Sequence, residues 1–213
     1  MNETELAASV VSWLQEQHWE IYQEVQYGYM GRVADIVARR GDILWIIECK
    51  TSYCFCVLEQ ATRWPVHYRS IAVPWARTPR DYRVALNYYQ VGVLEVEHNS
   101  VEEIIDAPLC VRHHKAAKRI VSSLIDLYKT YALAGSRSGN HLTPYKHTMI
   151  EVRKVIENNP GCTIGFLYDQ LGKQHYSSKD SFKGNLLKAL EDLEKWCKID
   201  KNSKPNKLSV LAE

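Results

Sequence analysis

Two acidic residues and a lysine stand close to the ends of two predicted strands, and their types suit them to chemistry. Asp35 lies in the sequence V-A-D-I-V-A, and Glu48-Cys49-Lys50 follows the apolar run 43–47. Side chains alternate along a strand, so Glu48 and Lys50 point to the same side. A neighbouring strand that carries Asp35 can place its carboxylate beside Glu48. Two carboxylates offer the oxygen ligands that a hard divalent cation such as Mg²⁺ prefers.

The elements that must position these residues are two strands joined by a tight turn. Arg40-Gly41-Asp42 supplies the turn residues between the strand of Asp35 and the run 43–47. That run is apolar on both faces, which is typical of a strand in the middle of a covered sheet. The alternation of further predicted strands and helices indicates an α/β architecture.

This arrangement resembles the signature of the PD-(D/E)xK nuclease superfamily, in which an Asp is followed after a spacer by (Asp or Glu)-x-Lys. The matching residues here are Asp35 and Glu48-Cys49-Lys50, and a predicted helix carrying Glu59-Gln60-Ala61 follows them. The order E-V, D-I-V-A, E-x-K, E-Q-A, A-V-P also resembles that of uncharacterised bacterial members, over roughly residues 3–76. The alternative interpretation is a simple ion pair between Glu48 and Lys50 at a strand end.

The resemblance implies a fold and a set of metal ligands. The fold would be restriction-endonuclease-like, a mixed central sheet flanked by helices. Asp35, Glu48 and the backbone carbonyl of Cys49 would bind Mg²⁺, for which Mn²⁺ can substitute. A Glu of the first helix often adds a contact in this superfamily, and Glu5 is the better match, with Glu3 as the alternative.

The resemblance also implies the roles of two further side chains. Lys50 would orient or deprotonate the attacking water and stabilise the charged phosphate, and Gln60 would orient the site or the DNA backbone. The implied reaction is hydrolysis of DNA phosphodiester bonds by an endonuclease. Because one site cuts one strand, a homodimer is a further expectation. For Gln60 the alternative is an exposed polar residue, and for both first-helix Glu residues it is an interaction with the helix dipole.

The remaining pattern of the first part predicts helices and strands in alternation. A cluster of acidic residues, Glu95, Glu97, Glu102 and Glu103, lacks a partner base and is interpreted as a solvated edge. Helices are expected at 3–18, 57–67, 78–90 and 112–133, and strands at 21–28, 68–75 and 91–97.

A Gly-, Ser- and Asn-rich stretch at 135–144 predicts a linker between a nuclease-like domain, 1–134, and a second domain, 145–213. The second domain resembles a winged helix: three helices, the third capped by Ser177 or Ser178, then a hairpin. Its third helix and wing would contact DNA, through Lys179, Lys183, Asn185, Lys201 and Lys204. Many winged helices bind protein instead, and this alternative stays open.

Composition sets the limits on function. The 213 residues are 46% hydrophobic and 24% charged, with a net charge of +2, so DNA binding must rest on local patches. No apolar run is long enough to span a membrane, and the acidic N-terminus lacks the basic start of a signal peptide. The six cysteines show no framework spacing, which favours unpaired thiols in a reducing cytoplasm.

The sequence therefore predicts a cytoplasmic, Mg²⁺-dependent deoxyribonuclease whose partner is DNA. Two alternatives belong to other classes of protein. One is a non-catalytic nucleic-acid-binding or regulatory protein that uses the nuclease fold as a scaffold. The other is a nuclease-like interaction protein whose winged domain meets another protein.

Overall fold

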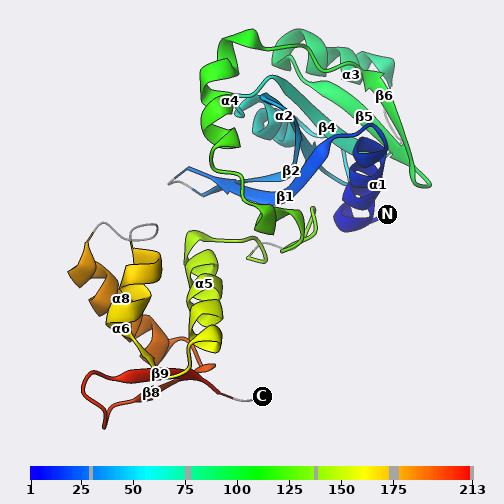
Figure 1. Ribbon diagram of the computed structural model, residues 1–213. Coiled ribbons are helices and arrows are strands. Elements are labelled where there is room, and N and C mark those ends of the chain that lie inside the picture. Colours follow the sequence, from blue (N-terminus) through cyan, green and yellow to red (C-terminus); the bar gives the residue numbers. More distant parts are fainter. Residues whose placement is uncertain (29–30, 75–77, 137–138, 173–177, 212–213) are drawn as a thin grey trace. The chain divides into compact units, whose positions relative to one another are not determined.

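The computed structural model describes residues 1–28, 31–74, 78–136, 139–172 and 178–211. The chain divides into two compact units, Met1–Leu142 and Thr143–Glu213 (Figure 1). This division falls inside the predicted linker. None of the helices within the described ranges has the length and apolar character needed to cross a membrane.

The first unit is built on a mixed sheet whose strands, within the described residues, number six and follow one another in chain order (Figure 1). Antiparallel pairs join β1 to β2, β2 to β3 and β5 to β6, whereas β4 is parallel to both β3 and β5. The expected mixed sheet flanked by helices is thus confirmed. The strands are β1 (Glu20–Tyr27), β2 (Arg32–Arg40), β3 (Ile43–Cys49), β4 (Tyr68–Pro74), β5 (Gly92–Glu97) and β6 (Ser100–Ile105).

Helix α1 (Glu3–Glu16) covers one face of the sheet, as the predicted first helix requires. Asn2 caps it: its side chain accepts a hydrogen bond from the Glu5 N–H at 2.8 Å, and the Glu5 carboxylate accepts one from the Asn2 N–H at 2.9 Å. Leu6, Val10 and Leu14 recur at helical spacing, are fully buried and pack on the sheet. The apolar stripe and the cap therefore define this helix.

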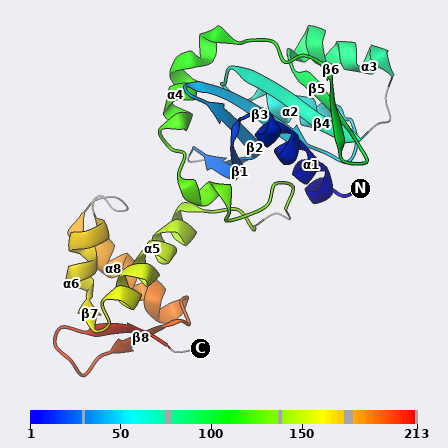
Figure 2. The same ribbon diagram turned by 45° about the vertical axis from the view of Figure 1, so that its right-hand side comes forward.

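Helix α2 (Phe55–Thr62) lies on the opposite face of the sheet (Figures 1 and 2). Its Val57, Leu58 and Ala61 side chains join a buried cluster with Ile71 and Val73 of β4. Because helices cover both faces, the central strands are apolar on both sides, as the run 43–47 indicated. The helical stretch predicted at 78–90 is confirmed as α3 (Pro79–Val84) continued by a π-helical turn, η1 (Ala85–Tyr89).

The single helix predicted at 112–133 is wrong. A 3-10 turn, η2 (Val111–His113), leads into a short helix, α4 (His114–Val121), and a second 3-10 turn, η3 (Asp126–Lys129), follows after a break. The Ser122 and Ser123 hydroxyls donate to the carbonyls of Lys118 and Ile120 at 3.0 and 2.8 Å. Such serine hydroxyls compete with the helical backbone, so this pair marks where the helix ends.

The acidic cluster of β5 and β6 is only partly a solvated edge. Glu97, Glu102 and Glu103 are exposed, but Glu95 is 3% exposed and accepts a hydrogen bond from the Tyr82 hydroxyl. The interpretation was therefore wrong for Glu95, because η1 and α3 fold over the side of β5 that carries it.

Residues 134–136 and Leu142, most of which the composition assigns to a linker, belong to the first unit. The Ala134 N–H donates to the Gln23 side chain, and the Thr4 hydroxyl donates to the Gly135 carbonyl, both at 3.0 Å. Gly135 has a φ of +73°, and a Cβ there would lie 2.6 Å from the Glu3 backbone, so glycine permits this close approach. Leu142 is 1% exposed and ends the unit.

The second unit contains helices and a small antiparallel sheet in the order β7-β9-β8. Its core gathers apolar residues of both long helices and of β9, among them Val152, Phe182 and Leu208. Ser178 caps the last helix by accepting from the Ser181 N–H at 3.2 Å, whereas Ser177 lies outside the described residues. The elements are α5 (Pro144–Asn158), β7 (Cys162–Thr163), α6 (Ile164–Leu167), η4 (Tyr168–Gly172), α8 (Lys179–Asp192), β8 (Cys197–Asp200) and β9 (Lys207–Val210).

Candidate functional site

Three carboxylates form a row across β1, β2 and β3. The β1–β2 register, continued across the interruption at Glu24, brings this residue to Asp35. The β2–β3 register, extended one step beyond the Ile36–Ile47 pair, brings Asp35 to Glu48. Directly opposite side chains of paired strands are near neighbours, and like charges in such positions destabilise a sheet. The row is therefore an unfavourable arrangement unless protons or a cation neutralise it.

Asp35 and Glu48 are brought together, as the sequence predicted. The Asp35 carboxylate accepts from the Cys49 N–H at 2.7 Å and is hydrogen-bonded to the Glu48 carboxyl. Glu48, which is 4% exposed, also accepts from the Trp64 indole N–H at 2.5 Å. Burial, followed by the charge of Asp35, raises the pKa of Glu48 to about 8, and burial raises the pKa of Asp35. The Glu48 carboxyl therefore holds a proton near neutral pH that a cation can replace.

Glu24 is the residue that the sequence analysis missed. It is 7% exposed and has a φ of +50° that interrupts the β1–β2 pairing. Its Oε1 atom has no hydrogen-bond partner among the residues that the structure describes. Burial and the charge of Asp35 raise its pKa to about 7, although the backbone N–H groups of Gly135 and Ser136 act to lower it. The charges of Asp35 and Lys50 both act on the Glu24 carboxylate, the first raising its pKa and the second lowering it. The only sequence signal was a Glu interrupting the apolar pattern of the first predicted strand.

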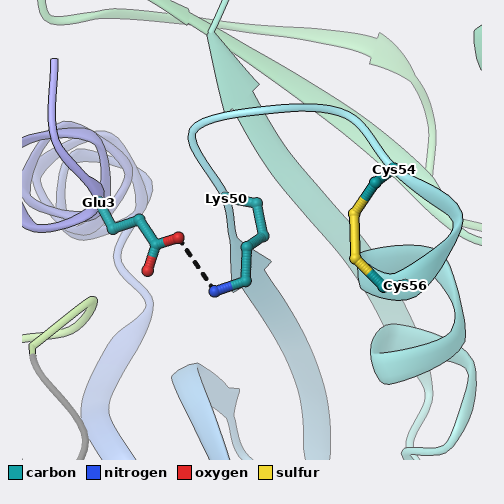
Figure 3. The surroundings of a disulfide bond; sticks show 4 residues. All are labelled: Glu3, Lys50, Cys54 and Cys56. Carbon is teal, nitrogen blue, oxygen red and sulfur yellow. Dashed lines mark hydrogen bonds and ion pairs between the residues drawn. A yellow bond between two sulfur atoms is a disulfide. The ribbon is translucent and has the colours of Figure 1, made fainter.

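Lys50 extends the site toward α1. Its ammonium lies 3.0 Å from the Glu3 carboxylate and is about one-third exposed (Figure 3). Burial lowers the pKa of Lys50, but the Glu3 hydrogen bond and the charges of Glu3, Asp35 and Glu48 outweigh it, so the pKa is raised. Lys50 is therefore held as a cation beside the carboxylates, which suits charge stabilisation better than proton abstraction.

The two first-helix glutamates have different positions. Glu3, the alternative of the sequence analysis, contacts Lys50 directly. Glu5, the preferred match, is exposed and its carboxylate is bound to the Asn2 N–H in the capping box. The structure thus associates Glu3, and not Glu5, with the lysine; a metal contact for Glu5 stays a prediction.

Gln60 and Glu48 line the same small pocket of about 150 Å³. Gln60 is exposed on α2, and Arg32 and Arg63 line the pocket as well. The Arg32 guanidinium donates to the Arg63 carbonyl at 3.4 Å. This pocket therefore adds positive charge and an amide next to the carboxylate row, as a phosphate-containing ligand requires.

The carboxylate row fits a hard divalent cation in its chemistry. Mg²⁺ commonly uses only one or two protein carboxylates and completes its ligands with water and substrate phosphate. Asp35 and Glu48 supply two adjacent carboxylates, and the unpartnered Oε1 of Glu24 is a further acceptor. Over the part of the chain that the structure describes, no three His, Cys, Asp or Glu side chains converge as a complete ligand set. The Cys49 carbonyl stays a predicted ligand.

A disulfide joins Cys54 and Cys56 between Lys50 and the first turn of α2 (Figure 3). The expectation of unpaired thiols was wrong for these two residues. It holds for Cys49, Cys110, Cys162 and Cys197, which are free. Disulfides persist mainly in oxidising compartments, so the cytoplasmic location stays a prediction.

The predicted DNA-contacting side chains of the second unit are all exposed, and they comprise Lys179, Lys183, Asn185, Lys201 and Lys204. Lys201 is paired with Glu191 at 3.0 Å, and the Asn185 amide donates to the Ser181 hydroxyl at 3.3 Å. Surface pairs of this kind contribute little to stability, so the paired groups can exchange partners.

Comparisons with known proteins give one distant structural match. No family model matches the sequence, and no curated protein matches it. The solved structure of a protein of unknown function from Silicibacter pomeroyi is similar, with a TM-score of 0.42 and 17% identity, over 58% of this chain and 86% of that one.

Proposed function

We propose that this chain is a metal-dependent DNA endonuclease of the PD-(D/E)xK class, carrying a winged-helix-like DNA-binding unit. The single observation that carries the proposal is the buried Asp35–Glu48 pair with Lys50 beside it. Desolvated like charges are costly, and functional sites are where such clusters concentrate. The order of the sheet and helices in each unit agrees with this class.

Each side chain has a role that follows from its surroundings. Asp35 and Glu48 would hold Mg²⁺ or Mn²⁺, with Glu24 as an additional acceptor. When bound, the cation supplies positive charge against the phosphate and acidifies water. Lys50, held as a cation, stabilises the negative charge that develops on the phosphate. Gln60 orients the DNA backbone from α2.

The second unit would raise the local concentration of DNA at the site. Its exposed Lys179 and Lys183 lie one helical turn apart on α8, the helix that would enter the major groove. Lys201 and Lys204 stand between β8 and β9, where a wing would meet phosphates. Specificity for DNA over RNA rests on the winged-helix assignment and is part of the proposal.

The test is cleavage of supercoiled plasmid, linear duplex and single-stranded DNA by the full chain, with Mg²⁺, Mn²⁺ or EDTA. Lys50→Ala should abolish cutting and leave DNA binding in a gel shift intact. Lys118→Ala is the matched control, because Lys118 also pairs with a carboxylate, Asp42, at 3.4 Å but lies on α4. Cutting that survives in EDTA, or in the Lys50→Ala variant, contradicts the proposed mechanism.

The second candidate is a non-catalytic nucleic-acid-binding protein that keeps the nuclease architecture. It is favoured by the ion pair that engages Lys50 with Glu3, and by the incomplete ligand set of the described residues. Folded protein that binds DNA, fails to cut every substrate and shows no thermal stabilisation by Mg²⁺ would establish this candidate in place of the first.

A further inference from the structure

A second cavity, of about 350 Å³, lies away from the carboxylate row. Its aromatic walls are Trp19, Trp45 and Tyr68. Trp45 packs with the α1 cluster, on the face of β3 opposite to that of Glu48, since the two residues are an odd number of positions apart. The cavity is therefore separate from the proposed catalytic site and independent of that proposal.

The three rings form a fixed box. The Trp45 ring centroid lies 5.7 Å from that of Trp19 and 6.4 Å from that of Tyr68, with interplanar angles of 67° and 61°. The Trp45 indole N–H donates to the Ser70 hydroxyl at 2.9 Å, and the residue is 6% exposed. Rings held at such steep angles present faces and edges on several sides of one volume, so the walls exist before a ligand enters.

Two carboxylates stand at the rim of this box. Glu103 on β6 and Asp106 after it line the cavity, and neither forms an ion pair with another described residue. The Glu103 carboxylate accepts from the Ala107 N–H at 3.4 Å. Burial raises the pKa of Glu103, the Ala107 N–H lowers it, and the neighbouring charge of Asp106 adds a smaller rise. A positive charge nearby would offset this effect of Asp106.

Arg40 shows that the aromatic lining accepts a cation. Its guanidinium carbon lies 4.3 Å from the Trp19 ring centroid, and the same group donates to the Gln17 carbonyl. Trp19 and the Gln17 carbonyl therefore hold the Arg40 guanidinium, and no hydrogen bond or ion pair among the described residues joins it to Glu103 or Asp106. One guanidinium against two carboxylates leaves the lining with a net negative charge.

From this combination we propose that the cavity binds a small organic cation, an alkylated or quaternary ammonium group. Aromatic faces attract such cations, and the bulky alkyl substituents fill a preformed apolar volume that a hydrated metal ion would not. An anionic ligand would meet the two carboxylates. A neutral planar base would stack on the rings but gain nothing from the rim charges.

The test compares the binding of choline with that of 3,3-dimethyl-1-butanol, its uncharged isostere, in which a carbon atom replaces the quaternary nitrogen. Binding to the full chain is followed by tryptophan fluorescence and confirmed by calorimetry. Choline should bind at least about tenfold more tightly than its uncharged isostere, because only the cation gains from the rings and the acids. Added salt should weaken choline binding, since the rim is exposed.

Glu103→Gln should reduce the preference for choline several-fold, whereas Glu102→Gln is the matched control. Glu102 neighbours it on β6 and is exposed, but it does not line the cavity. Both positions are on the surface, so neither change should unfold the protein. Equal affinity for the two probes, no binding of either, or tighter binding of adenosine than of choline would overturn the proposal.

Discussion

Replacing Glu24 by Gln should stabilise the first unit at alkaline pH while impairing the proposed activity. The folded protein buries this carboxyl and raises its pKa from 4.5 to about 7. Below pH 4.5 the group is protonated in both the folded and the unfolded chain. Between pH 4.5 and about 7 the unfolded chain ionises while the folded chain keeps the proton, so stability that was present in acid is lost over this range.

The size of this loss follows from the pKa values. Each pH unit between 4.5 and about 7 is worth about 1.4 kcal/mol, which gives a cost of about 3 kcal/mol at pH 8. Gln has nearly the same shape and cannot ionise, so it removes this cost. Loss of the Glu24 charge also eases ionisation of Glu48, whose raised pKa owes part of its rise to Glu24. An amide N–H placed where the Glu24 Oε1 atom lies will lack a hydrogen-bond acceptor, and this will cancel part of the gain in the free energy of unfolding.

Urea unfolding in EDTA, followed by tryptophan fluorescence at pH 4.5 and pH 8, measures the effect. Trp196 is the only tryptophan in the sequence after residue 142, so the signal reports mainly on the first unit. Glu16→Gln at the exposed end of α1 is the control, and it should leave the free energy of unfolding unchanged at both pH values. An equal gain at both pH values, or none at pH 8, would refute the argument that burial raises this pKa.

Three further outcomes are expected. Trp64→Phe removes the N–H donor to buried Glu48 and should lower the free energy of unfolding by about 1–3 kcal/mol in chemical denaturation, with an unchanged value pointing to another donor. Lys183→Ala should weaken DNA binding uniformly across sequences and reduce the slope of log affinity against log salt by about one, whereas a sequence-selective loss would indicate a base contact. Alkylation of denatured, unreduced protein should label the four free cysteines and leave Cys54 and Cys56 unlabelled, and mass spectrometry that finds all six labelled would contradict the disulfide.

The sequence sufficed for the parts of the site that depend on local pattern. Alternation and a turn predict β2 and β3, and side-chain direction then brings Asp35 to Glu48. Glu24 could not be found this way, because its position beside Asp35 depends on how β1 pairs with β2 and on a left-handed backbone at Glu24 itself. Strand register is a property of the assembled sheet and is only weakly encoded in one strand.

Competition between local interactions explains the other differences. The apolar stripe of 112–133 favours one helix, but paired serines bond back to the backbone and end it at Val121. Glu5 directly precedes the apolar stripe of α1, yet the N-terminal cap engages its carboxylate, and Glu3 contacts Lys50 instead. The aromatic cavity escaped the sequence because its walls come from segments that only the folded sheet brings together.

Gly135 and Leu142 determine where the first unit can be cut. The composition alone favours a truncation after residue 134, where the predicted linker 135–144 begins. Such a chain would lose the Gly135 and Ser136 backbone groups that lower the pKa of Glu24, and the Gly135 carbonyl that Thr4 binds beside Glu3. It would fold with an altered site, and its lack of activity would reflect the missing Gly135 and Ser136 contacts and not the chemistry of the first unit. A chain shortened after Leu142 keeps these contacts, and is the fragment in which the first unit should be assayed alone.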